Sequence, residues 1–231
     1  PCMAAPITWP QYRQNAQHTG QTNRNLLGCP GNPVIKWTNR QFIDPYHNSV
    51  TIRDQRRLYV SGINRRVYLL TNGVVSNQNS VTTVFDTFIS PSLGPDGNVI
   101  IGIVNGKIFT FFPSLADAWS STAIGNPYST EIISGLPNMY YALTTAGDIV
   151  IFSNQIQRGM GYIGSTTYNS APLLLPDGSV VVGGSMGIGC YTNGLQKWWT
   201  NLGSIQASPT LDETGTIYAL STSGNIHAIT N

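Results

Sequence analysis

The sequence predicts an all-β protein, and three observations lead to this prediction. Short runs rich in Val, Ile, Tyr and Thr recur along the chain, separated by turns built from Gly, Asn, Asp and Pro. The runs are grouped in fours at a spacing of roughly 40 residues, which is typical of propeller blades and solenoid coils. No segment shows the apolar period of about 3.6 residues that marks an amphipathic helix. The expected fold is a five-bladed β-propeller of four-stranded antiparallel blades.

The chain begins with a segment that lies outside the repeat. Residues 1–33 are rich in Pro, Gln and Asn and show no periodicity. We expect this leader to lie as an extended strap over the domain, with Trp9 and Tyr12 as its anchors. Residues 34–231 then form a single propeller domain.

The clearest landmark of the repeat is a β-rich run that enters a two-residue turn. The second turn residue is Gly in four copies and Arg65 in the first, where Asn64 precedes it. Such turns need positive φ angles, which Gly and Asn adopt at least cost. The five runs are Leu58–Arg65, Val99–Gly106, Tyr140–Gly147, Val180–Gly187 and Ile217–Gly224.

Two other landmarks accompany each run. A Ser-Pro or similar step precedes it, most clearly at Ser90-Pro91 and Ser208-Pro209, and a tight connection such as Asp96-Gly97 or Asp177-Gly178 follows the step. An aromatic strand comes ahead of each unit; its tryptophans are Trp37, Trp119, Trp198 and Trp199, and the equivalent places at Asn77 and Gly159 have lost the Trp. Outer-strand aromatics are expected to fill the gap between neighbouring sheets.

The two ends of the repeat predict how the ring closes. The chain enters with an outer aromatic strand, Val34–Thr38, and ends after a third inner strand, Asn225–Ile229. Together they make one complete blade, so we expect the N-terminal outer strand to pair with the C-terminal blade. Such pairing would leave no exposed sheet edge.

Composition narrows the classes of partner. Charged residues make up only 10% of the chain, and the formal net charge of +2 is too small to predict nucleic-acid binding. No run of about 18 apolar residues predicts membrane insertion. A surface made from Ser, Thr, Asn, Gln and Gly favours an extracytoplasmic protein, whether secreted, in the periplasm or envelope, or on a particle surface.

Three cysteines leave one unpaired under any single disulfide. Cys2 and Cys29 flank the leader and form the candidate disulfide; three reduced thiols are the alternative. Cys190 lies in an expected strand and reads as a small buried apolar residue.

The landmarks together resemble the PQQ-like β-propeller repeat, and Ala207–Ile229 is the closest copy. The segment Trp9–Gly20 also looks like the entry segment of such propellers. The superfamily includes quinone-dependent alcohol dehydrogenases and outer-membrane assembly scaffold lipoproteins. The enzyme branch implies an adjacent cysteine pair and an acidic calcium site. This sequence has no adjacent cysteines and spreads its carboxylates over the blades, so we expect no quinone cofactor.

A few residues are candidates for ligand or partner binding. Arg40, in the loop entering the first inner strand, is expected to share a face with Arg65 and Arg66, where the three could bind a carboxylate or a sulfated or phosphorylated glycan. A solvated basic face is the simpler alternative. His47 is included as a candidate, although neither it nor the other two histidines has a partner at metal-ligand spacing. No metal site and no catalytic residue is predicted.

These observations favour a non-enzymatic structural or binding propeller. We expect a rigid protein-interaction or assembly module, secreted or in an envelope, virion surface or filament, with a protein partner or a second copy as its ligand. A carbohydrate-binding lectin is one alternative, because exposed Trp and Tyr could stack on sugar rings. An unusual PQQ-dependent quinoprotein is the other.

Overall fold

The computed structural model describes residues 35, 37–40, 50–54, 56–62, 65–80, 90–103, 107–121, 133–136, 139–144, 147–154, 156–162 and 170–230. These residues form five antiparallel sheets and no helix. The all-β, five-bladed propeller predicted from the repeat is confirmed. The leader 1–33, with Cys2 and Cys29, lies outside the described residues, and so does His47.

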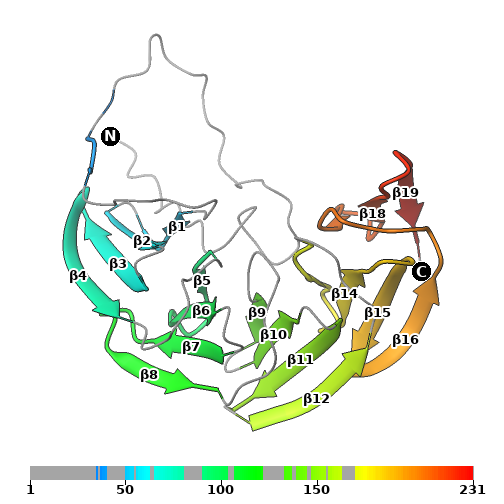
Figure 1. Ribbon diagram of the computed structural model, residues 1–231, viewed down its shortest axis with the longest axis horizontal. Helices are drawn as coiled ribbons and strands as arrows, with labels where there is room; N and C mark the ends of the chain where they lie inside the picture. Colours follow the sequence, from blue (N-terminus) through cyan, green and yellow to red (C-terminus); the bar gives the residue numbers. More distant parts are fainter. Residues whose placement is uncertain are drawn as a thin grey trace.

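Each sheet is one blade, and its strands follow the chain from the inside outward (Figure 1). Blade one consists of β1 (Thr51–Ile52), β2 (Arg57–Ser61), β3 (Arg66–Thr71) and β4 (Val74–Ser80). Blade two consists of β5 (Ser92–Leu93), β6 (Val99–Ile103), β7 (Lys107–Phe111) and β8 (Asp117–Ser120). Blade three consists of β9 (Ile133–Leu136), β10 (Met139–Leu143), β11 (Asp148–Ser153) and β12 (Ile156–Tyr162). Blade four consists of β13 (Leu173–Leu174), β14 (Val180–Gly183), β15 (Ile188–Thr192) and β16 (Leu195–Thr200). Blade five has only β17 (Thr210–Leu211), β18 (Ile217–Leu220) and β19 (Ile226–Ile229).

Positive φ angles occur where the turn chemistry predicted them. Arg65 has φ 62°, and Gly147 and Gly224 have φ 90° and 84° at the equivalent turns. Gly187 differs, because its φ is not positive; a Cβ there would lie 2.0 Å from the Thr200 carbonyl oxygen. Glycine is therefore needed at this fourth turn for close backbone approach and not for its left-handed conformation.

Neighbouring blades pack face to face through apolar side chains. We call the face toward the next blade in sequence the forward face, and the other the backward face. Alternate residues of each strand serve the two faces, as the period of a β-strand requires. Four clusters fill the four junctions; between blades three and four, for example, Leu143 and Ile149 of the forward face contact Val180 and Val182 of the backward face.

Outer strands contribute to the same junctions in two ways. Trp119 in β8 packs onto blade three, with its ring centroid 6.3 Å from that of Tyr140 and 5.4 Å from that of Phe152. This confirms the aromatic filling predicted for that strand. In β4, where the Trp is absent, Asn77 Nδ2 donates to the Ser114 carbonyl at 2.5 Å and Asn79 Nδ2 to the Leu115 carbonyl at 2.7 Å. Amide hydrogen bonds thus replace the ring.

The described parts of the five blades form an open arc, and no pairing between the described residues of 34–38 and β19 is found (Figure 1). Residues 35 and 37–40 are not in a strand, and β19 is an edge strand in the described part of the chain. Asn39 Nδ2 donates to the Gly73 carbonyl of blade one at 2.9 Å, and the Trp37 ring lies directly against Gly73. Because these contacts hold the entering segment on blade one, it lies across the opening from β19.

Candidate binding site

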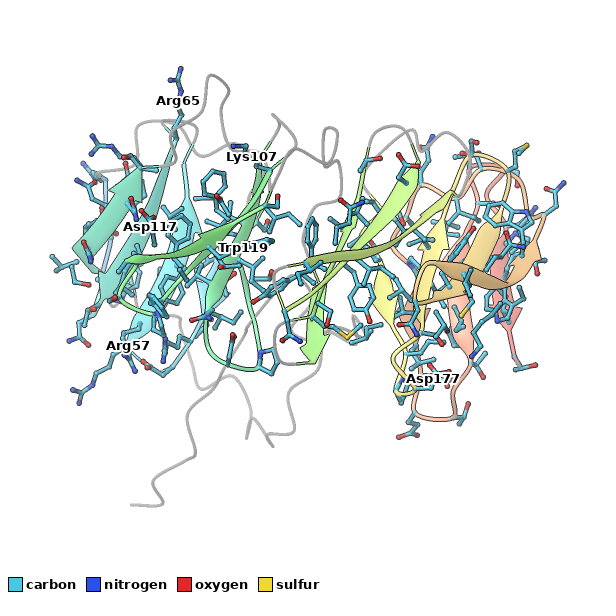
Figure 2. All side chains as sticks on the ribbon, turned by 90° about the horizontal axis from the view of Figure 1, so that it is seen from below. Arg57, Arg65, Lys107, Asp117, Trp119 and Asp177 are labelled. Atoms are coloured by element: carbon cyan, nitrogen blue, oxygen red, sulfur yellow. The ribbon has the colours of Figure 1, made fainter. Side chains whose placement is uncertain are left out.

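Arg65 and Arg66 lie together at one end of blade one. Arg65 occupies the left-handed position of the β2–β3 turn, and a hydrogen bond of 2.9 Å from Gly62 N to the Arg66 carbonyl closes that turn. Both arginines are exposed. Figure 2 shows Arg65 projecting away from the body of the molecule, at the end opposite Arg57. Arg57 and Arg65 therefore lie at opposite ends of blade one.

No contact found in the described residues brings Arg40 to this pair, so the trio stays a prediction. Its neighbour Asn39 bonds the β3–β4 turn at Gly73. That turn lies beside Arg56, whose carbonyl accepts from Asn72 N at 2.8 Å. The length of β3 separates this end of the blade from Arg65 by roughly 20 Å. The position of Arg40 could not be read from the repeat, because it depends on where the entering segment docks.

Lys107 adds a second basic position that the sequence reading missed. It begins β7, as Arg66 begins β3, so it lies at the equivalent end of the next blade. Figure 2 shows Lys107 and Arg65 at the same end of the molecule. Arg65, Arg66 and Lys107 are here called the basic rim. The alignment of the repeats contained this signal, since both residues follow the same turn.

Aspartates at the opposite end shape the turns. Asp177 Oδ1 accepts from Ser179 N at 2.9 Å, and Asp212 Oδ1 accepts from Thr214 N and Thr216 N at 2.8 and 2.9 Å. Asp54 does the same for Arg56 N and Arg57 N, and its carboxylate also pairs with the Arg57 side chain. These bonds satisfy donors that the tight turns leave free. The carboxylates therefore serve turn geometry.

One cluster brings together groups that could be mistaken for a catalytic pair. Lys197 Nζ lies 2.9 Å from Asp177 Oδ2 and 3.2 Å from Ser179 Oγ. The hydrogen bond to Asp177 raises the pKa of Lys197, while Lys197 and the Ser179 N–H lower the pKa of Asp177 to about 2. A lysine held in its charged form cannot take a proton from the serine. The cluster is an ion pair over a turn.

Two further side chains that could be reactive, those of Cys190 and His227, also have structural contacts. Burial raises the pKa of the Cys190 thiol, which lies in the core between blades four and five. His227 Nε2 lies 3.3 Å from Ser221 Oγ. Within the ranges that the structure describes, no three His, Cys, Asp or Glu side chains gather as a metal site. Nor does that part of the chain contain a helix long and apolar enough to cross a membrane.

Comparison with known proteins defines the fold. No protein-family model matches the sequence. No curated protein matches it. Among solved structures, the chain is similar to BamB from Moraxella catarrhalis, with a TM-score of 0.65, 15% sequence identity, and coverage of 85% of this chain and 61% of that chain. It is also similar to the WD40 β-propeller domain of Doa1, with a TM-score of 0.61, 12% identity, and coverage of 79% and 62%.

These likenesses show a β-propeller fold, as the PQQ-like repeat predicted. At such identities they show the fold alone. The chain spans less than two thirds of the length of either structure.

Proposed function

We propose that the protein is a rigid, non-enzymatic propeller that binds a protein partner or assembles with itself, outside the cytosol or on a particle, envelope or filament surface. One observation carries this proposal. Among the described residues, the side chains that could take part in a reaction stabilise turns or pack at blade junctions instead. The Asp177–Lys197 ion pair and buried Cys190 are examples. The low charge and scarcity of lysine support the extracytoplasmic setting.

The basic rim is the surface that we assign to the partner. Arg65 and Arg66 are exposed, and Lys107 lies at the same end of blade two (Figure 2). No salt bridge to any of the three is found in the described residues. Guanidinium groups bind carboxylates through two parallel hydrogen bonds, so an acidic protein segment fits this surface.

Binding to polyglutamate, measured by calorimetry at low salt, tests the assignment. We expect the double variant Arg65→Glu/Arg66→Glu to weaken binding by about tenfold or more, because like charges replace opposite ones. The matched control is Arg56→Glu/Arg57→Glu, which makes the same charge change at the other end of the blade. Equal losses in the two variants would show non-specific attraction and remove the assignment.

A lectin remains the second candidate, supported by Trp37, whose side chain is 47% exposed. A glycan array, including heparin as a sulfated probe, distinguishes the two. Selective sugar binding that Trp37→Ala abolishes and Arg65→Glu/Arg66→Glu preserves would favour the lectin. When PQQ and calcium are added to the protein, the absorption spectrum of the PQQ should not change. A change would favour the quinoprotein.

A further inference from the structure

Two turns of the molecule carry the same reactive sequence. Residues 71–74 read Thr-Asn-Gly-Val and join β3 to β4, and residues 192–195 read Thr-Asn-Gly-Leu and join β15 to β16. Asparagine before glycine is prone to deamidation, because glycine has no side chain to hinder attack by its backbone nitrogen on the asparagine amide carbon. The flanking residues match closely, so a difference in reactivity between the two turns must come from the surrounding structure. A third such step, Asn105-Gly106, lies outside the described residues.

The backbone conformation of the two turns is also the same. The φ angle is 53° at Asn72 and 82° at Gly73. It is 51° at Asn193 and 81° at Gly194. Two successive positive φ angles are typical of the type I′ turn, which joins antiparallel strands through two residues. Both asparagines are exposed. Neither the conformation of the turn nor the exposure of the asparagine therefore separates the two sites.

The two turns differ in the contacts that they receive from other segments. In blade one, the Asn72 N–H donates to the Arg56 carbonyl at 2.8 Å. Asn39 Nδ2 donates to the Gly73 carbonyl at 2.9 Å. The Trp37 ring covers Gly73, since a Cβ on this glycine would lie 2.7 Å from Trp37 Cγ, and Gly73 is buried. Three contacts from elsewhere in the chain thus fix the turn of blade one.

The turn of blade four lacks comparable contacts among the residues that the structure describes. The ladder between β15 and β16 ends at the pair Thr192 and Leu195, so the two turn residues lie outside it. Gly194 is half-buried, and within the described ranges no hydrogen bond reaches it or Asn193 from another segment. No other described part of the chain therefore holds the Gly194 backbone nitrogen in place.

We propose that Asn193 is a site of spontaneous deamidation in the folded protein and that Asn72 is protected from it. The Gly194 backbone nitrogen attacks Cγ of the Asn193 side chain, and a new C–N bond forms. The side-chain amide nitrogen takes up the proton of the Gly194 N–H and leaves as ammonia. Water then opens the five-membered imide at either carbonyl, which gives aspartate or isoaspartate. The reaction consumes one water, releases one ammonia and needs no oxidant.

Protection of Asn72 follows from the movement that the attack requires. The backbone must rotate at the Asn-Gly step, because the glycine nitrogen has to approach the asparagine Cγ. At residues 72–73 this rotation would break the hydrogen bond from Asn39 and push Gly73 against the Trp37 ring. A hydrogen bond and a ring contact together slow such local opening by about tenfold or more. At residues 193–194 no described contact opposes the rotation.

The modification changes both the charge and the backbone of blade four. A carboxylate replaces a neutral amide, so the formal net charge falls by one from its value of +2. Isoaspartate also adds a carbon atom to the main chain of a two-residue turn, and the length of that turn sets the register of the hairpin. We expect the pairing of Cys190 with Trp198 across β15 and β16 to weaken. The modified protein should therefore unfold at a lower temperature than the unmodified protein.

Peptide mass spectrometry with fragmentation, after incubation of the full chain at mildly alkaline pH, tests the proposal. Conversion at Asn193 should be faster than conversion at Asn72 by about tenfold or more. The control is the same incubation in concentrated urea, where the two sites should convert at similar rates because no folded contact remains. Similar rates in the folded protein would overturn the inference. An Asn193 that converts in urea but stays intact in the folded protein would also overturn it.

Two variants test the protection of Asn72 directly. Trp37→Ala and Asn39→Ala each remove one contact to Gly73. Each variant should raise the rate of conversion at Asn72 and leave the rate at Asn193 unchanged, because residues 193–194 belong to another blade. Circular dichroism checks that the variants are folded, and Asn39→Ala suffices if Trp37→Ala does not fold. An unchanged rate at Asn72 in the folded variants would show that these contacts do not protect it.

Discussion

Blades three and five have similar strands but different surroundings. In blade three, the inner residues of β11 are buried on both faces, between blades two and four. In blade five, β18 alternates between buried and exposed, and no residue of β19 is fully buried. Sequence alone does not separate Ile149 of β11 from Ile226 of β19. The difference shows that a blade obtains much of its burial from its neighbours, so the end of an open arc is intrinsically its weakest part.

The largest effect expected from this comparison is in the core of blade three. Ile149 is fully buried, whereas Ile226, at the equivalent position of blade five, is 76% exposed. Ile149→Ala should lower the free energy of unfolding by about 3 kcal/mol, through lost burial and a residual cavity. Ile226→Ala should lower it by less than about 0.5 kcal/mol in the monomer. Urea denaturation at low protein concentration measures both, and equal losses would show that blade five is covered in solution.

Close backbone approach should produce the next effect. A Cβ at Gly187 would lie 2.0 Å from the Thr200 carbonyl oxygen, whereas at Gly215 of blade five it would meet nothing within 4 Å. Gly187→Ala should therefore cost about 2–3 kcal/mol, because backbone atoms must move. Gly215→Ala should cost about 1 kcal/mol, from its φ of 90° alone. Thermal unfolding measures both losses of stability. A larger loss for Gly215→Ala than for Gly187→Ala would contradict the argument that backbone crowding at Gly187 dominates.

The sequence predicted the blades because their signals are local. Turn residues with positive φ, such as Arg65 and Gly147, define where strands reverse, and alternation defines which side chains are buried. The angle between blades is not local. It depends on what fills each junction: a ring from Trp119 between blades two and three, but Asn77 and Asn79 amides between blades one and two. Whether the ring closes therefore depends on these contacts and not on the repeat alone.

The residues of the candidate site also differ in whether local sequence determines their position. Arg65 and Arg66 were predicted together because one turn holds both. The position of Arg40 instead depends on a contact between residues far apart in sequence, Asn39 and Gly73, which the repeat does not encode. Lys107 can be found only by aligning the first residues of equivalent strands in blades one and two. The arginines of blade one alone do not indicate it.

A smaller effect should separate the equivalent tyrosines of blades three and five. The Tyr141 hydroxyl donates across the junction to the Gly178 carbonyl, whereas that of Tyr218 bonds the exposed Asp212 of its own blade. Tyr141→Phe should cost about 1 kcal/mol, because a carbonyl loses its partner at a largely buried junction. Tyr218→Phe should leave the monomer's unfolding midpoint unchanged. Equal shifts in chemical denaturation would show that the two hydroxyls have the same environment.

The smallest expected effect is a pH-dependent change in stability, which should differ between the turns of blades four and five. Hydrogen bonding to Lys197 lowers the pKa of Asp177 from 3.8 to about 2, whereas the pKa of Asp212 is lowered mainly by its Thr214 hydrogen bond, with no cation involved. A carboxyl whose pKa is lower in the folded state stabilises the protein above its unfolded pKa. That contribution is lost as the pH falls from about 4 to about 2.

Asp177→Asn isolates the charge, since its side-chain oxygen can still accept from Ser179 N. Because the ion pair is exposed, the variant should lose less than about 1 kcal/mol at neutral pH. The difference from the wild type should shrink as the pH falls towards 2, vanish only below it, and shrink in about 1 M salt. Asp212→Asn should show the same pH dependence in sign but no response to salt, because its partners are neutral. A salt-dependent difference in both variants would mean that general surface charge, and not the Lys197 pair, stabilises the turn of blade four.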